Sequence, residues 1–110
     1  MTVNDIAKNM NLTFYTGEEL ADKEATGCYI GDLLSLAMSK VQMNYVWITI
    51  QTNVNIVAVA SLAEAACVIL VDGMVPDKAA LERAREQEII ILGGEISAYD
   101  AACALSEMGI

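Results

Sequence analysis

Hydrophobic and polar positions are most clearly grouped in the uncharged stretch from Tyr45 to Ala63. The stretch is apolar at both ends and carries amide and hydroxyl side chains in its middle. This pattern predicts a buried strand over 45–50, a polar turn over 51–53 and a helix over 54–65. We expect the rest of the chain to be arranged around these three elements.

Strands and helices are expected to alternate along the remaining sequence. Continuous apolar runs at 68–71 and 89–92 are typical of strands buried on both faces of a parallel sheet. The pattern also predicts short strands at 12–15 and 28–30, and helices at 3–10, 33–42, 76–87 and 97–108. The alternation indicates a single α/β domain over residues 1–110. It should have three layers, α/β/α, with a small, mostly parallel sheet and helices on both faces.

Polar residues at two helix starts support these boundaries. Thr2 followed by Asp5 resembles a capping box for the first helix. Asp32 has the position and chemistry of an N-cap for the helix over 33–42. That second helix is expected to turn one wide apolar face inward, formed by Leu33, Leu34, Ala37, Met38 and Val41.

The helix predicted over 54–65 is apolar on nearly every side. The face expected to pack on the sheet contains Ile56, Val59, Ala60 and Ala63. A helix of this kind is buried all round, which a domain of this size rarely achieves alone. Burial of each large side chain on the other faces would contribute about 1.5–3 kcal/mol, whereas exposure would leave a patch that favours association. We therefore expect a homodimer whose interface contains Leu36, Met43, Val54, Val57 and Leu62. The alternative is that the first helix and the charged loop over 18–24 cover this helix.

The charge of the chain excludes several classes of partner. Only six residues are Lys or Arg, and the net charge is −9. Nucleic acids and anionic membrane surfaces are bound by clustered cations, so we expect neither as a partner. The stretch from Val41 to Ala63 is long enough to cross a bilayer. Its central amides, Gln51, Asn53 and Asn55, would be costly in hydrocarbon, so we expect a core segment and no membrane partner.

Cysteine and histidine usage restricts location and chemistry. Cys28, Cys67 and Cys103 form no CxxC pair and lie among apolar residues, which is typical of free thiols in a reducing compartment. Residues 1–11 show no signal-peptide pattern, so we expect a cytoplasmic protein. The absence of histidine excludes Ser-His-Asp and Cys-His catalysis and His-ligated zinc. No GxxxxGK[ST] loop is present either, so we expect no enzyme activity, metal or cofactor.

A candidate ligand site lies where the parallel strands should end. Ligands of alternating α/β folds bind beyond the carboxyl ends of the strands, and the loops 51–53, 72–76 and 93–97 should meet there. The candidate ligand-binding residues are Thr49, Gln51, Thr52, Asn53, Asn55 and Asp72. The turn before the helix would offer backbone N–H groups, the helix dipole and uncharged side chains to an anion or a small polar ligand. Alternatively, this turn only caps the helix, and Gly93-Gly94 only turns the chain.

Several short strings together resemble a known family. They are Gly31-Asp32-Leu33-Leu34-Ser35, Trp47-Ile48-Thr49-Ile50-Gln51, Asn55-Ile56-Val57-Ala58-Val59-Ala60 and Gly73-x-x-Pro76. As a set they resemble small stand-alone DRTGG-domain proteins of bacteria and archaea, over most of the chain. The DRTGG string itself is absent, because Gln51-Thr52-Asn53-Val54-Asn55 stands where it should follow the central strand.

The resemblance implies a regulatory role. The chain is similar to the amino-terminal domain of HPr kinase/phosphorylase, to the middle domain of long phosphotransacetylases and to an insert that accompanies CBS domains in some inorganic pyrophosphatases. In those settings the domain is a non-catalytic regulatory or assembly module, often at dimer contacts. The pyrophosphatase context implies adenine-nucleotide sensing. We therefore expect a homodimeric module that binds an adenine nucleotide or another small polar ligand, or alternatively a protein-interaction subunit without a ligand.

Overall fold

A five-stranded sheet forms the centre of the molecule, and a computed structural model describes all 110 residues of the chain. The strands are β1 (Thr13–Thr16), β2 (Gly27–Ile30), β3 (Tyr45–Thr49), β4 (Cys67–Leu70) and β5 (Ile91–Gly93). Their order across the sheet is β1-β5-β4-β3-β2, and only β1 runs antiparallel to its neighbour. The predicted small, mostly parallel sheet is confirmed.

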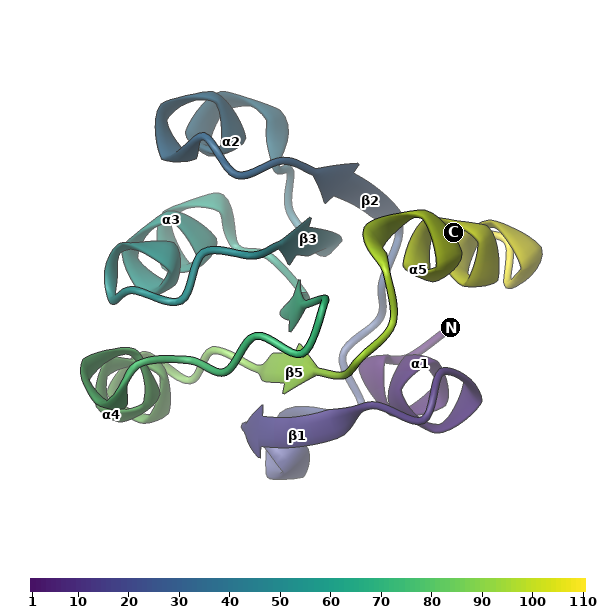
Figure 1. Ribbon diagram of the computed structural model, residues 1–110, viewed down its shortest axis with the longest axis horizontal. Coiled ribbons are helices and arrows are strands. Elements are labelled where there is room, and N and C mark those ends of the chain that lie inside the picture. Colours follow the sequence, from purple (N-terminus) through teal and green to yellow (C-terminus); the bar gives the residue numbers. More distant parts are fainter.

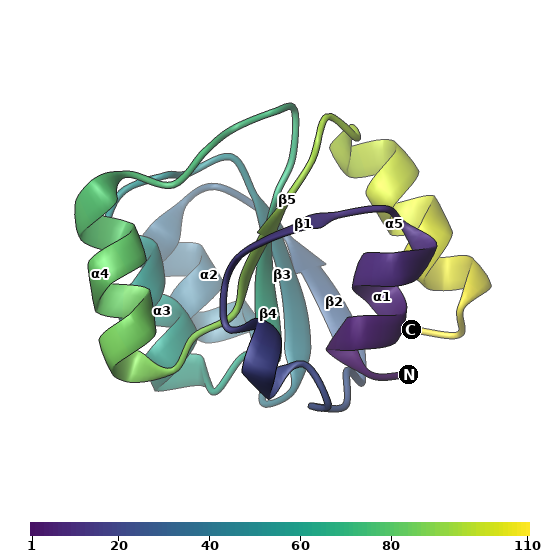
Figure 2. The ribbon, with the colours of Figure 1, turned by 90° about the horizontal axis from the view of Figure 1, so that it is seen from below.

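Helices cover both faces of this sheet. They are α1 (Val3–Asn9), the 3-10 turn η1 (Glu18–Leu20), α2 (Leu34–Lys40), α3 (Asn55–Ala63), α4 (Lys78–Gln87) and α5 (Ala98–Glu107). Figure 1 shows α2, α3 and α4 side by side along the sheet, and Figure 2 shows α1 and α5 together on the opposite face. The three-layer α/β/α architecture is therefore confirmed. None of these helices has both the length and the hydrophobicity that a membrane crossing requires.

The central strand β3 joins the two halves of the core. Val46 and Ile48 belong to the apolar cluster on the α1/α5 side, whereas Trp47 belongs to the cluster under α2, α3 and α4. All three side chains are fully buried, because successive residues of a strand point to opposite faces and both faces are covered. The predicted buried strand is confirmed, and it ends at Thr49, one residue earlier than expected.

The helix α3 is covered by its own chain, which corrects one part of the predicted dimer interface. It is the middle helix of three, and it packs against α2 on one flank and α4 on the other. Val57 is consequently 0% exposed and has no surface to offer a second copy. Val54 is half-buried, and only Leu62, at 70%, is well exposed. The alternative cover was also wrong, because α1 lies on the opposite face of the sheet (Figure 2).

The helix α2 departs most from expectation. It begins at Leu34 after the N-cap residue Leu33, without a side-chain cap, so Asp32 does not cap it. Of the apolar face predicted to turn inward, only Ala37 and Val41 are buried, while Leu33 and Met38 are largely exposed. The physical reason is position: α2 lies at the β2 end of the sheet, where no further helix covers its outer flank (Figure 1).

A buried threonine explains why β5 starts later than predicted. The hydroxyl of Thr16 donates to the carbonyl of Ile89 at 2.8 Å and accepts from the amide of Ile91 at 3.0 Å. The register between β1 and β5 shifts at this point. Ile89 and Ile90 are therefore buried but lie outside the strand, and β5 begins only at Ile91.

Candidate functional site

The loops that follow the parallel strands meet at one edge of the sheet, as predicted. The amide of Asp77 donates to the carbonyl of Thr52 at 2.9 Å, which joins the loop after β3 to the start of α4. The amide of Gly73 donates to the carbonyl of Gly94, also at 2.9 Å, which joins the loops after β4 and β5. The candidate residues 49–55 and Asp72 therefore lie at the same edge.

Asp32 organises the end of β3. Its Oδ1 atom accepts hydrogen bonds from the hydroxyl of Thr49 at 2.8 Å and from the amide of Ile50 at 3.0 Å. The side-chain amide of Gln51 donates to the main-chain carbonyl of Asp32 at 2.9 Å. Thr49 is only 1% exposed, so its hydroxyl serves this internal contact and is not available to a ligand.

The polar turn itself is also tied together by its own side chains. The Nδ2 atom of Asn53 donates to Oε1 of Gln51 at 3.2 Å, and Oδ1 of Asn53 accepts from the amide of Asn55 at 2.9 Å. The amide of Ile56 donates to the carbonyl of Asn53 at 3.2 Å. The N-cap residue of α3 is Val54, without a side-chain cap, and Asn53 just before it holds the amides of Asn55 and Ile56. These two amides are therefore not free to receive an anion, contrary to what the sequence had suggested.

Three candidate residues contribute no side chain to this network. Thr52 is half-buried, and Asn55 and Asp72 are exposed at the same edge. Asp72 adopts a left-handed backbone with φ of 56°, and Gly73 follows with φ of 71°. The positive φ favours glycine at position 73, and the carboxylate of Glu95 lies close to this turn, 2.8 Å from where a Cβ of residue 73 would be. The groups left for a ligand are one hydroxyl, one amide and two carboxylates.

The edge of the sheet that carries residues 49–55 and Asp72, here called the polar edge, is open and not hollow. None of the five surface hollows of the molecule is lined by residues 49–55 or by Asp72. No group of three or more acidic or cysteine side chains is placed to hold a metal ion. A ligand at this edge would therefore rest on the surface of a single copy and contact it on one side only.

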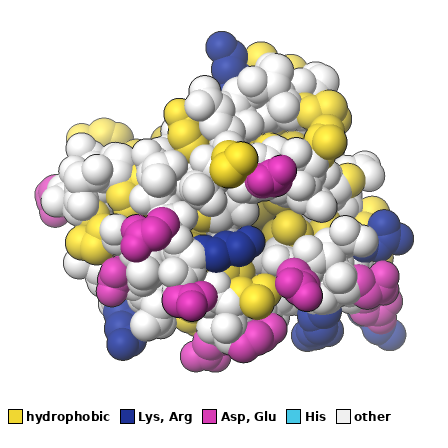
Figure 3. Space-filling model, turned by 180° about the vertical axis from the view of Figure 1, so that it is seen from behind, with side chains coloured by type: hydrophobic (Ala, Val, Ile, Leu, Met, Phe, Trp, Pro, Cys, Tyr) yellow, Lys and Arg dark blue, Asp and Glu magenta, His cyan; other side chains and the backbone are white.

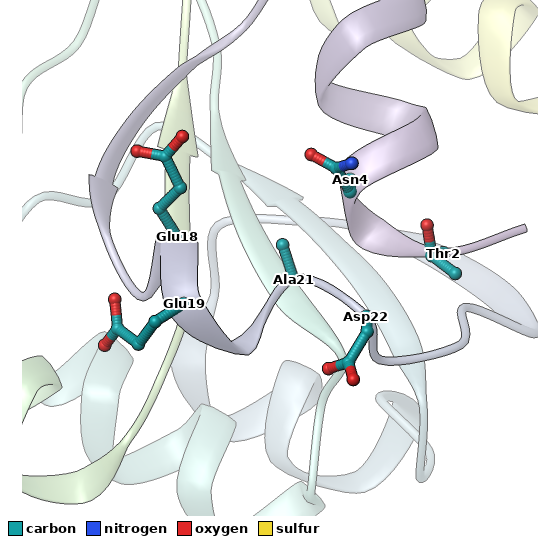
Figure 4. Close-up of a pocket in the computed structure, with 6 residues that line it drawn as sticks. All are labelled: Thr2, Asn4, Glu18, Glu19, Ala21 and Asp22. Carbon is teal, nitrogen blue, oxygen red and sulfur yellow. The ribbon is translucent and has the colours of Figure 1, made fainter.

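The charged segment after β1 lines a hollow of about 440 Å³. Figure 4 shows its residues: Glu18 and Glu19 project from η1, Asp22 follows it, and Thr2 and Asn4 come from the start of α1. The carboxylates of Glu18 and Asp22 point away from one another in this view. The three carboxylates do not converge on a common point, which is the arrangement of a solvated acidic surface.

The groups with shifted pKa values lie away from the polar edge. Burial raises the pKa of the Cys28 thiol to about 11 and, with a further contribution from Cys28, that of Cys67 to about 12. Hydrogen bonds from the amide and hydroxyl of Thr2 lower the pKa of Asp5, which belongs to the predicted capping box of α1. A hydrogen bond with Cys103 raises the pKa of Tyr99. None of these groups lies near the ends of β3 and β4.

Most of the residues predicted to contact a second copy are exposed. Leu36, Met43 and Leu62 project into solvent, and Val57, as described above, does not. Sequence reasoning missed four further exposed apolar residues at the end of the sheet formed by β2 and α2: Ile30, Leu33, Met38 and Ile50. No local pattern distinguishes them from core residues, because their exposure results from the position of β2 and α2 at the end of the sheet.

Comparison with known proteins gives a structural relative but no sequence family. No family model matches the chain. No curated protein matches it either. A solved structure of the CBS and DRTGG domains of the regulatory region of Clostridium perfringens pyrophosphatase, complexed with its activator diadenosine tetraphosphate, is similar with a TM-score of 0.75. The likeness covers 94% of this chain and 45% of that chain, at 13% sequence identity. The chain thus spans less than half of that regulatory region and shares the fold found there.

Proposed function

We propose that the chain is a non-catalytic regulatory module of the DRTGG type, which acts as a homodimer and senses a small polar ligand. The observation that carries this proposal is the turn at 51–55, which is fixed by Asp32 and by its own side chains. A turn fixed in this way would lose little entropy when a ligand binds. Thr52, Asn55 and Asp72 are the residues of this edge that would contact the ligand.

An adenine nucleotide is the first ligand class to test. The pyrophosphatase regulatory region with the same fold is complexed with diadenosine tetraphosphate, its activator. The uncharged turn offers hydrogen-bond donors and acceptors that suit a base or ribose. Asp72 and Glu95 would repel phosphate groups, so we expect the base and ribose to provide most of the contact.

The chemistry of the chain supports a role without catalysis. Enzyme sites usually contain a nucleophile or base whose pKa is tuned toward the working pH. Here the pKa values of Cys28 and Cys67 move upward, which keeps both thiols protonated at neutral pH. All three cysteines are free, which supports the cytoplasm as the location.

The homodimer is supported by the apolar surface around α2. Leu33, Leu36, Met38 and Met43 are exposed in the single chain on α2 or next to its ends, whereas the exposed Leu62 lies beside α4. A monomer gains nothing from these large side chains in water, whereas their burial between two copies would be favourable. Two copies would also enlarge the open polar edge into a site with more than one wall.

A thermal-shift titration with AMP, ATP and diadenosine tetraphosphate tests ligand sensing. We expect at least one nucleotide to raise the melting temperature, and Thr52→Val and Asn55→Ala to reduce the rise. Thr26→Val, an exposed threonine away from the edge, is the matched control and should keep the full rise. No rise with any nucleotide, or equal rises in all variants, would contradict sensing at this edge.

A second function, an assembly subunit without a ligand, is favoured by one observation. Thr49, Gln51 and Asn53 direct their polar atoms at one another and at Asp32, so their side chains are satisfied without a ligand. In that case the protein would dimerise in light-scattering measurements and give no thermal shift with nucleotides.

A further inference from the structure

The two end strands of the sheet differ in how their open edges are protected. Natural proteins block open edges with bulges and charges, which prevent pairing with another strand. The β1 edge has both: its register shifts between Phe14 and Thr16, and Glu18, Glu19 and Arg85 line the adjoining hollow. The β2 edge has neither, because its register with β3 is continuous and residues 25–31 contain no charge and no proline.

The same end of the molecule is also free of net charge. The segment from residue 25 to 63, which forms β2, α2, β3 and α3, contains one acidic residue, Asp32, and one basic residue, Lys40. The whole excess of negative charge therefore lies in the rest of the chain. Figure 3 shows acidic side chains mainly in the lower half of the molecule and hydrophobic ones prominent in the upper part, the end at which Figure 1 places α2. Two identical acidic chains meet with the least repulsion at this end.

We propose that two copies of this chain pair antiparallel through their β2 strands and form one continuous ten-stranded sheet. The inference rests on the homodimer of the proposed function and specifies its contact. A two-fold axis perpendicular to the sheet relates antiparallel edge strands, so both α2 helices would lie on the same face, one on each side of the axis. Leu36 and its exposed neighbours on α2 would then supply the apolar contact that a short strand pair lacks.

The N-terminus limits the register of this pairing. The amide of Thr26 donates toward β3, to the carbonyl of Asn44, so the amide of Ala25 faces the outer edge. There it donates to the carbonyl of Met1 at 2.9 Å, which blocks a partner strand at Ala25. At the other end the amide of Gly31 donates to the carbonyl of Ile48 and its carbonyl accepts from the indole N–H of Trp47. The free outer edge therefore runs from Gly27 to Ile30.

Symmetry and this free edge leave two registers. In a two-fold antiparallel pair, opposite residues share a face, so the pair is centred on a residue that faces its own copy. Centring on Cys28 pairs residues 26–30, and centring on Tyr29 pairs residues 28–30; both leave Ala25 bonded to Met1 and Gly31 bonded to β3. The first register puts Cys28 opposite the partner's Cys28. The second puts Tyr29 opposite the partner's Tyr29 and Ile30 opposite the partner's Cys28. Aromatic pairs of this kind stabilise neighbouring strands.

Charge substitution at Ile30 tests the contact. Ile30 is exposed, so Ile30→Glu and Ile30→Lys leave the folded monomer intact, which circular dichroism checks. In equilibrium sedimentation each variant alone should associate about 100-fold more weakly than the natural chain, because like charges meet across the axis. An equimolar mixture of the two should recover the dimer. Thr13→Glu, on the β1 edge, should have no effect on association. A dimer that persists in Ile30→Glu would overturn the pairing.

Cross-linking tests the register. In a Cys103→Ser background, oxidation with copper phenanthroline should link Cys28 to Cys28 of the other copy if the pair is centred on Cys28. If the pair is centred on Tyr29, the disulfide-linked dimer should form only after Ile30→Cys, through Cys28 of the other copy. Cys67 does not compete, because it is fully buried and β3 separates it from Cys28 by about 10 Å, which is beyond disulfide reach. Thr13→Cys in the same background is the control and should add no disulfide link beyond any that its parent forms.

The outcomes separate this inference from the proposed function. A natural chain that sediments as a monomer would overturn both the homodimer and the edge pairing, whereas nucleotide sensing is judged by the thermal shift alone. A natural chain that dimerises, together with an Ile30→Cys variant that forms no disulfide through Cys28, would overturn the edge pairing and leave the homodimer standing.

Discussion

Asp32 holds Thr49 by a hydrogen bond of 2.8 Å between its Oδ1 atom and the threonine hydroxyl. The two residues are 17 positions apart, and the contact forms because β2 and β3 are neighbouring parallel strands. The same oxygen also accepts from the amide of Ile50. Asp32 therefore fixes the point at which β3 ends and the polar turn begins, and the candidate site depends on it.

Replacement of Asp32 should destabilise the protein and loosen the turn. Asp32→Ala leaves the nearly buried hydroxyl of Thr49 and the amide of Ile50 without their partner, at a cost of about 1–3 kcal/mol in the free energy of unfolding. Urea denaturation measures this change. Asp72→Asn is the control, because Asp72 is exposed and asparagine tolerates its left-handed backbone, so it should change the free energy by less than about 0.5 kcal/mol. Equal effects of both substitutions would contradict the anchoring role of Asp32.

Substitutions on α3 should distinguish its covered side from its exposed end. Val57→Ala removes two buried methyl groups between α2 and α4 and should lower the free energy of unfolding by about 1–3 kcal/mol. Leu62→Ala, on an exposed side chain, should cost less than about 0.5 kcal/mol in dilute protein. Denaturant unfolding with Trp47 as the single tryptophan reporter measures both. A small effect at Val57 would mean that the chain does not cover this helix alone.

The hydroxyl of Thr16 should matter more than its methyl group. Thr16→Val keeps the shape but leaves the carbonyl of Ile89 and the amide of Ile91 without a partner, in a site where Thr16 is buried. We expect a loss of about 1–3 kcal/mol in stability, as for other unsatisfied buried groups. Thr16→Ser keeps the hydroxyl and should cost less than the valine variant. Thermal unfolding of both variants tests this order. A serine variant less stable than the valine variant would contradict this account of the register shift between β1 and β5.

Stability should decrease in alkaline solution because of two buried thiols. Both ionise near 9.0 in the unfolded chain, whereas burial raises the pKa of Cys28 to about 11 and that of Cys67 to about 12 in the folded one. Their contribution is therefore fully present below pH 9 and is lost as the pH rises toward 11 and 12. In this window each thiol lowers the free energy of unfolding by up to about 1.4 kcal/mol for each pH unit.

Urea unfolding at pH 8, 9 and 10 measures this slope. Cys67→Ala removes one of the two thiols and should make the dependence on pH shallower, even though the cavity lowers stability at every pH. An unchanged slope in this variant would show that other groups cause the alkaline loss.

Features set by residues close in sequence could be predicted, and features set by topology could not. The capping box of Thr2 and Asp5 was predicted because its partners are three residues apart, and the structure contains both hydrogen bonds. The contact between the side chain of Asn53 and the amide of Asn55, the first residue of α3, is equally local. Asp32 was misassigned because its partner Thr49 comes within reach only when β2 pairs with β3.

The other wrong predictions concern burial, which depends on the order of the strands in the sheet. Val57 was expected at the surface because α3 was considered without its flanking helices, and the strand order places one on each side. Leu33 and Met38 were expected in the core because their spacing is that of an inward face, but α2 lies at the end of the sheet. The ligand-binding residues were correctly placed at one edge, and their role there stays a prediction.

The uneven placement of acidic residues gives the molecule a large electric dipole, with its negative pole away from β2 and α2. Repulsion between the acidic regions of two approaching copies has a range of roughly 10 Å at 0.1 M salt and roughly 3 Å at 1 M. Added salt should therefore strengthen self-association, in contrast to complexes that are steered together by opposite charges. Ionic strength would then regulate how much of the protein is paired.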